Sequence, residues 1–260
     1  ILDQLRGLAL FGDDYTRAGA TKKFLESFSG SARDPQRAAF MALTRAGYID
    51  EDECLDLERA SIPIEFDDAT VAEADTMAVA PPLDAPGRRD LTGLEVVTID
   101  DKGTRDRDDG LSIEVESGDA GSGKAYKVGI HITDAGSVVE RESALDIEAD
   151  RRMSTLYLPE RTISMLPPSV SADKGSLNPG QQRAALSVMA TLDSLGEVLA
   201  WEVVPSVVES RAALPYEEVD AALTNADAPM HESLTALETL SRALRTRREA
   251  AGALNLERDE

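Results

Sequence analysis

The chain reads Thr98-Ile99-Asp100-Asp101-Lys102-Gly103-Thr104-Arg105-Asp106-Arg107-Asp108-Asp109-Gly110 where two predicted strands meet. The first predicted strand covers residues 94–99, and Asp100 lies at its C-terminal end. The second begins after Asp109, because Leu111, Ile113 and Val115 alternate with polar residues at the period of a strand. A connecting loop of this length can fold its aspartates toward one point. The pattern therefore predicts a dense group of carboxylates at one edge of a sheet.

Four aspartates of this stretch are the candidate functional residues: Asp100, Asp106, Asp108 and Asp109. Carboxylates held a few ångströms apart repel one another, and this repulsion raises their pKa values. A bound divalent cation removes the repulsion, and ligands that are all oxygen favour a hard ion. We therefore expect Mg²⁺, with Mn²⁺ as the alternative. Such a centre is typical of enzymes that hydrolyse phosphodiesters.

Two other interpretations of the stretch stay open. Asp109-Gly110 is also a hairpin signal, so the segment could be a solvated turn stabilised by Arg105 and Arg107. The second is a structural loop stabilised by calcium or magnesium. Its EF-hand form does not fit, because that loop needs glycine sixth from the first aspartate, whereas Gly110 is fifth from Asp106.

The C-terminal part of the chain predicts an α+β fold around a mostly antiparallel sheet. Its further elements are a strand through Val128, Ile130 and Ile132, a strand pair at 184–192 and 197–206, and a helix at 230–251. His131 lies on the polar side of its strand, so we expect a hydrogen-bonded structural residue rather than a catalytic one. Trp201 and Val203 are predicted to be strand core.

Residues 1–87 are predicted to form a small helical domain. Its C-terminal boundary is predicted from the stretch 80–87, which has the composition of a linker. Asp34 before Pro35 is an N-cap signal for one helix, and Asp50 is a candidate cap for the next. With an extended segment at 62–66, these elements suit either a winged helix-turn-helix or a plain helical packing module. The second helix is acidic, which speaks against contact with a polyanion.

Composition limits the classes of function. The chain has 260 residues, a formal net charge of −22, one cysteine and two histidines. A zinc or copper site built from Cys and His is therefore nearly excluded, and a chain without a possible internal disulfide suits the cytoplasm. No apolar run is long enough to span a membrane. The negative charge speaks against non-specific binding of nucleic acid, although a metal centre can supply local positive charge.

Several further motifs, together with the aspartate stretch, resemble the ribonuclease II (RNB) family of exoribonucleases in their order and spacing. They are Arg89-Asp90-Leu91-Thr92, Gly129-Ile130-His131-Ile132-Thr133-Asp134, Leu145-Asp146-Ile147-Glu148-Ala149, Thr155-Leu156-Tyr157-Leu158-Pro159, Ile163-Ser164-Met165-Leu166-Pro167, Gly175-Ser176-Leu177-Asn178, Arg183-Ala184-Ala185-Leu186-Ser187 and Arg248-Glu249-Ala250-Ala251-Gly252-Ala253-Leu254. The resemblance covers about residues 88–258. It implies that residues 88–260 form the N-terminal part of an RNB-like catalytic domain.

What the resemblance implies is a magnesium-dependent 3′-to-5′ exoribonuclease that degrades single-stranded RNA and releases nucleoside 5′-monophosphates. All four aspartates match the family's catalytic positions. Asp100, Asp106 and Asp109 would bind the metal, and Asp108 would lie closest to the chemistry. Tyr157 matches a family aromatic residue that stacks near the 3′-terminal base.

The sequence departs from the family pattern at both ends. Residues 1–87 do not resemble the usual pair of cold-shock β-barrels, and the later catalytic half, with its arginine-bearing motif, does not occur before Glu260. We therefore expect a truncated chain that is a monomer and requires the missing C-terminal part for full activity. The alternative is a non-catalytic RNA-binding or regulatory protein on the same scaffold, although concentrated negative charge disfavours binding of phosphate.

Overall fold

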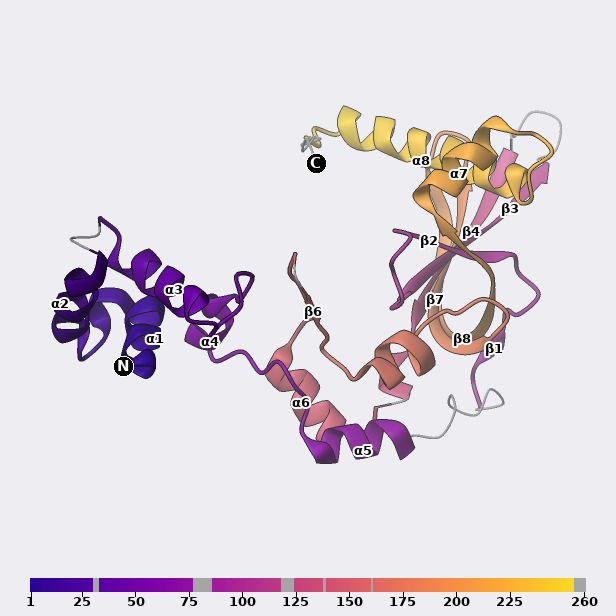
Figure 1. Cartoon of the computed structure of the whole chain (residues 1–260). Helices are drawn as coiled ribbons and strands as arrows, with labels where there is room; N and C mark the ends of the chain where they lie inside the picture. Colours follow the sequence, from indigo (N-terminus) through magenta and orange to yellow (C-terminus); the bar gives the residue numbers. More distant parts are fainter. Residues whose placement is uncertain (30–32, 77–85, 118–123, 138, 160, 255–260) are drawn as a thin grey trace. The chain divides into compact units, whose positions relative to one another are not determined.

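A computed structural model describes residues 1–29, 33–76, 86–117, 124–137, 139–159 and 161–254 of the chain (Figure 1). The chain divides into two compact units. The first contains Ile1–Asp67 and Arg152–Ile163, and the second contains Asp68–Arg151 and Ser164–Glu260. Most of the predicted linker, at 80–85, lies outside the described residues. Within the described part of the chain, no helix combines the length and the apolar character needed to cross a membrane.

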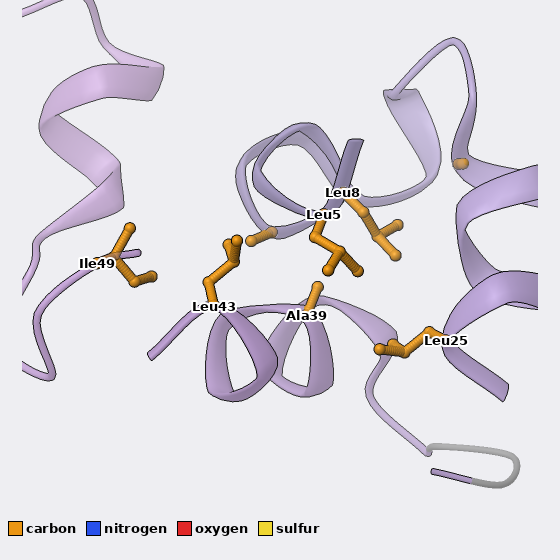
Figure 2. Packing of buried hydrophobic residues seen from close by; sticks show 8 residues of the cluster. Leu5, Leu8, Leu25, Ala39, Leu43 and Ile49 are labelled. Atoms are coloured by element: carbon orange, nitrogen blue, oxygen red, sulfur yellow. The ribbon is translucent and has the colours of Figure 1, made fainter. Parts of the chain in front are cut away.

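The first unit is a helical module with its own core. Its helices are α1 (Leu2–Phe11), α2 (Ala18–Ser29), α3 (Pro35–Arg45) and α4 (Leu55–Arg59), with a short 3₁₀ turn at Gly12–Asp14. Figure 2 shows the side chains of Leu5, Leu8, Ala39 and Leu43 directed into the space between α1 and α3. Asp34 accepts a hydrogen bond from the amide of Arg37 at 3.0 Å, which confirms the predicted N-cap.

One detail predicted for the helical module is wrong. The helix expected after Asp50 begins instead at Leu55, because residues 51–52 form a turn and Cys54 is the N-cap. The segment 62–66, which would be the wing in one of the two interpretations, forms no strand. The strand pair of this unit comes from later in the chain, where β5 (Leu156–Tyr157) pairs with β6 (Thr162–Ile163). The boundary at residue 87 and the helix-turn-helix interpretation stay predictions.

The second unit is built around a sheet, as the alternating segments predict. Its helices and strands are α5 (Asp68–Thr76), β1 (Arg89–Asp90), β2 (Val96–Asp100), β3 (Asp109–Ser117), β4 (Lys124–Thr133), α6 (Ala144–Arg152), β7 (Gln182–Asp193), β8 (Val198–Pro215), α7 (Tyr216–Thr224) and α8 (His231–Ala250). Two short helical turns lie at Ala135–Ser137 and Val170–Lys174.

The strands form a ring that β8 closes. The order in the sheet is β1-β8-β2-β3-β4-β7, with an additional pairing of β7 with β8. The first part of β8 runs antiparallel to β7, and its last residues run parallel to β2, from Ser210 beside Val96 to Pro215 beside Asp100. The predicted α+β fold with a mostly antiparallel sheet is confirmed. The closure was not visible in the sequence, since it depends on the length and bending of one strand.

Helix α8 covers one end of the outer face of this sheet (Figure 1). There Ala236 and Leu240 pack on Tyr126 and Val128. Beyond the helix the same face stays apolar and open, as Ile130 and Ile132 are 39% and 41% exposed. The prediction that Trp201 and Val203 are strand core is therefore wrong: they are 70% and 45% exposed.

His131 belongs to a buried chain of hydrogen bonds on the opposite face. Ser206 Oγ donates its proton to the carbonyl of Ala185 at 3.1 Å. The hydroxyls of Ser187 and Ser206 lie 2.6 Å apart, so Ser187 must be the donor in the hydrogen bond between them. Ser187 can then only accept at 2.7 Å from His131 Nδ1, and Nε2 accepts from Ser112 at 2.9 Å. His131 is thus a neutral, fully buried structural residue, as expected.

Burial lowers the pKa of His131 to about 4, and this gives a test of the buried network. Between pH 6.5 and 4 the unfolded chain binds a proton at this residue and the folded chain does not. The free energy of unfolding should therefore fall by up to about 3 kcal/mol as the pH drops through this window. Urea unfolding at several pH values measures this loss. The variant His131→Gln should show a shallower dependence, and an identical slope in both proteins would contradict the assignment.

Candidate active site

The four aspartates lie where strands β2 and β3 meet the loop between them. Asp100 is the last residue of β2 and pairs with Pro215 of β8. Asp109 is the first residue of β3 and pairs with Ile132 of β4. The backbones of both residues are thus fixed in neighbouring strands of the closed sheet, and Asp106 and Asp108 lie in the loop that joins these strands.

Hydrogen bonds hold the loop 101–108 against a distant segment of the chain. Ser176 Oγ accepts from the amide of Arg107 and donates to the carbonyl of Arg105, each at 3.0 Å. The amide of Leu177 donates to the carbonyl of Arg107 at 2.9 Å, and that of Thr133 donates to the carbonyl of Asp108 at 2.8 Å. The backbone on both sides of the loop aspartates is therefore tied down.

The segment that holds the loop is itself held by Arg183. This arginine is buried, and its Nε donates to the carbonyls of Ser176 and Asp173 at 3.0 and 3.2 Å. Asn178 Nδ2 donates to the carbonyl of Ala172 at 3.1 Å. A buried guanidinium that satisfies several carbonyls fixes a turn that lacks regular structure of its own. The loop aspartates thus rest on a rigid support.

The charges of the four carboxylates act on one another. Asp108 is exposed to solvent, yet partial burial of its carboxyl group, followed by the charges of Asp106, Asp109 and Asp100, raises its pKa to about 6. Burial also raises the pKa of Asp100, with Asp109 as the second cause and Arg107 opposing it. The directions of these shifts are consistent with carboxylates near enough to interact electrostatically, and such coupling is common at functional sites.

The aspartates have the right donor atoms for a metal ion, but their side chains are too far apart to hold one. The donor set consists of carboxylate oxygens, which suits a hard divalent cation. Within the described ranges, however, no three side chains of His, Cys, Asp or Glu come close enough together to hold one ion. Binding would require the aspartate side chains to move closer together than they are in this structure.

Tyr157, the predicted RNA contact, lies in the first compact unit rather than with the aspartates. It is on β5, and its side chain is 69% exposed. An exposed aromatic ring can stack on a base. Its role stays a prediction.

Sequence reasoning did not assign a role to Ser176, Asn178 or Arg183, although it quoted all three within motifs. About 70 residues separate Ser176 from the loop that it holds, so no local period or spacing connects them. The signal that was available is composition. Polar residues in a stretch rich in proline and glycine need partners when they are buried, as Ser176 is.

Comparison with known proteins places this site in a family context. Ribonuclease R of Thermotoga maritima is 34% identical over 206 residues, which are 76% of this chain and 28% of that protein. The structure of Mycoplasma genitalium RNase R in complex with ribose-methylated single-stranded RNA superposes with a TM-score of 0.70 and 27% identity. The match covers 78% of this chain and 32% of that one. The chain thus spans less than a third of the length of either relative.

A further solved structure shows that similarity to this fold does not guarantee catalysis. Yeast Ssd1, described as a pseudonuclease, is similar with a TM-score of 0.54 and 26% identity over 65% of this chain and 21% of that one. The sequence model of the RNB domain matches residues 88–260. That range contains the closed sheet, the aspartate loop and the segment that holds it. The chain therefore belongs to the RNB domain family.

Proposed function

We propose that the protein is a magnesium-dependent 3′-to-5′ exoribonuclease that hydrolyses single-stranded RNA and releases nucleoside 5′-monophosphates. The observation that carries this proposal is the coupling of four aspartates on a tethered loop between two strands. A protein that only binds RNA gains nothing from four carboxylates beside the phosphates, because they repel the ligand. The similarity to ribonuclease R supports RNA as the substrate.

Each aspartate has a proposed role. Asp100, Asp106 and Asp109 would hold Mg²⁺ or Mn²⁺, which when bound supplies positive charge for the phosphate and favours ionisation of water. The amide of Thr133 fixes the backbone of Asp108 at the edge of the sheet. Asp108, which is not assigned to the metal in this proposal, would accept a proton from the attacking water.

The remaining parts of the proposal concern the partners of the chain. The exposed ring of Tyr157 would stack on the 3′-terminal base. We expect a cytoplasmic monomer. The net charge of −22 makes a further source of positive charge necessary for tight binding of RNA.

The second candidate function is a non-catalytic RNA-binding or regulatory protein. The similarity to the pseudonuclease Ssd1 favours it. The presence of all four aspartates at coupled positions speaks against it, because a protein without catalysis has no need to keep charges that destabilise its fold. The two candidates differ in whether RNA is shortened.

Incubation of the protein with 5′-labelled single-stranded RNA tests the reaction. In the presence of Mg²⁺ we expect a ladder that shortens from the 3′ end, with nucleoside 5′-monophosphates as products, and with EDTA we expect unchanged RNA. Denaturing gels and chromatography of the released nucleotides measure both. Internal cuts, or bound but intact RNA in Mg²⁺, would exclude an exonuclease.

The variant Asp108→Asn tests the role of the central aspartate. We expect turnover to fall by about 10³-fold, because the amide cannot accept a proton. RNA affinity and melting temperature should not fall, since the change removes one of four repelling charges. Asp101→Asn is the matched control, because Asp101 is an exposed aspartate of the same loop. Equal losses in both variants, or loss of folding in Asp108→Asn, would refute a specific role.

A further inference from the structure

Helix α5 belongs to the same compact unit as the aspartate loop, although it precedes the residues that match the RNB domain. The helix covers Asp68–Thr76, whereas the match begins at residue 88. In the structure α5 is part of the second unit, together with the closed sheet. A helix of 9 residues has little stability of its own, so contacts with the rest of this unit must hold it.

The helix packs on its unit through a buried alanine beside α6 (Figure 1). Ala74 has no exposed surface, and it shares one apolar cluster with Leu145 of α6, Leu166 and Val170. Ala72, two residues earlier, lies on the exposed side of the helix. Only one side of α5 is therefore in contact with this cluster.

Two charged side chains attach α5 to its neighbours, and each of them completes the end of a helix. Glu73 Oε2 accepts from the amide of Leu145, in the first turn of α6, at 3.2 Å. Lys174 Nζ donates to the carbonyl of Ala74, in the last turn of α5, at 2.8 Å. Amides at the start of a helix and carbonyls at its end lack partners within the helix, so both contacts satisfy groups that need one.

The turn Val170–Lys174, which contacts α5, also supports the aspartate loop. The carbonyl of Asp173 in this turn accepts from the amide of Ser176 at 3.1 Å. Ser176 Oγ in turn bonds to the backbone of Arg105 and Arg107 in the loop. A continuous series of hydrogen bonds and apolar contacts therefore connects α5, through this turn, with the loop between β2 and β3.

We propose that α5 is a brace for the aspartate loop and that Lys174 and Ala74 are positioning residues for the reaction. Arg183 holds the turn at Asp173, and α5 holds it at Lys174 and through the apolar cluster of Val170. A misplacement of a catalytic group by about 1 Å can lower the rate about 10²-fold, so the backbone of the loop needs a fixed support. The catalytic part of this inference rests on the proposed function, and the mechanical part does not.

The variant Lys174→Met in the 260-residue chain tests the mechanical part. It removes the ammonium group and keeps a side chain of similar length, so the contact with the carbonyl of Ala74 is lost. The amides of Arg107 and Leu177, which hold the loop to its support, should then exchange with solvent about tenfold faster. Amides in β4 and β7 should keep their exchange rates, because the sheet is unchanged. Hydrogen exchange followed by NMR measures all of these rates.

Three further variants serve as controls. Lys174→Arg keeps a donor and should keep the exchange rates of Arg107 and Leu177 within about twofold. Ala74→Leu overfills the buried cluster and should displace α5, with the same faster exchange in the loop. Ala72→Leu adds the same side chain on the exposed side of α5 and should change no rate. If Ala74→Leu does not fold, Lys174→Met provides the test by itself.

Hydrolysis of RNA tests the catalytic part. Lys174→Met should lower kcat about tenfold and leave KM within about twofold, because it displaces reacting groups and removes no contact with RNA. Lys174→Arg should restore kcat. A loss of global stability alone would not produce this separation of kcat from KM.

The outcomes distinguish this inference from the proposed function. Unchanged exchange of Arg107 and Leu177 in both Lys174→Met and Ala74→Leu would refute the brace, even if RNA is hydrolysed. Equally faster exchange throughout the sheet would refute it too, because it indicates only lower global stability. Faster exchange confined to the loop, with a normal kcat, would refute the positioning role. If the unchanged chain does not hydrolyse RNA, the proposed function fails, and faster exchange confined to the loop still supports the brace.

Discussion

Repulsion among the carboxylates of Asp100, Asp106, Asp108 and Asp109 is the constraint on which this structure depends. A loop left to itself would turn these charges outward into water, where they repel less. The chain prevents this by tying the backbone of the loop to Ser176 and Leu177 and by anchoring that segment through the buried Arg183. The raised pKa of Asp108 is the consequence, since the tether keeps its carboxyl group partly buried and near three other charges.

The closed sheet holds both ends of the aspartate loop in place against this repulsion. The loop connects β2 and β3, which are held in a closed ring of strands. The ring is closed because the long strand β8 pairs with both β2 and β7. The network through His131, Ser187 and Ser206 connects β4, β7 and β8 inside the same ring, with every donor used. Rigid strand ends and a rigid support leave only side-chain motions for the uptake of an ion, which is how precise sites are generally built.

The sequence predicted local features well and contacts between distant segments poorly. The helix cap at Asp34, the strands on either side of the aspartate loop and the structural role of His131 follow from spacing and residue type, and the structure confirms them. The closure by β8 could not be predicted, because it depends on one long strand that pairs with both β2 and β7. The exposure of Trp201 could not be predicted either, because it depends on how much of the outer face α8 covers. The role of Ser176 depends on contacts across some 70 residues of chain, which no periodicity in the sequence reveals.

The most direct test of the account is a carboxyl-carbon NMR titration of the four aspartates in the 260-residue chain, with and without Mg²⁺. Without the ion, Asp108 should titrate near pH 6, with Asp100 also above the usual range of an aspartate. Saturating Mg²⁺ should move both midpoints below that range, because a divalent cation stabilises the charged form. Ordinary midpoints for all four residues, unchanged by Mg²⁺, would show that the carboxylates neither interact nor bind the ion.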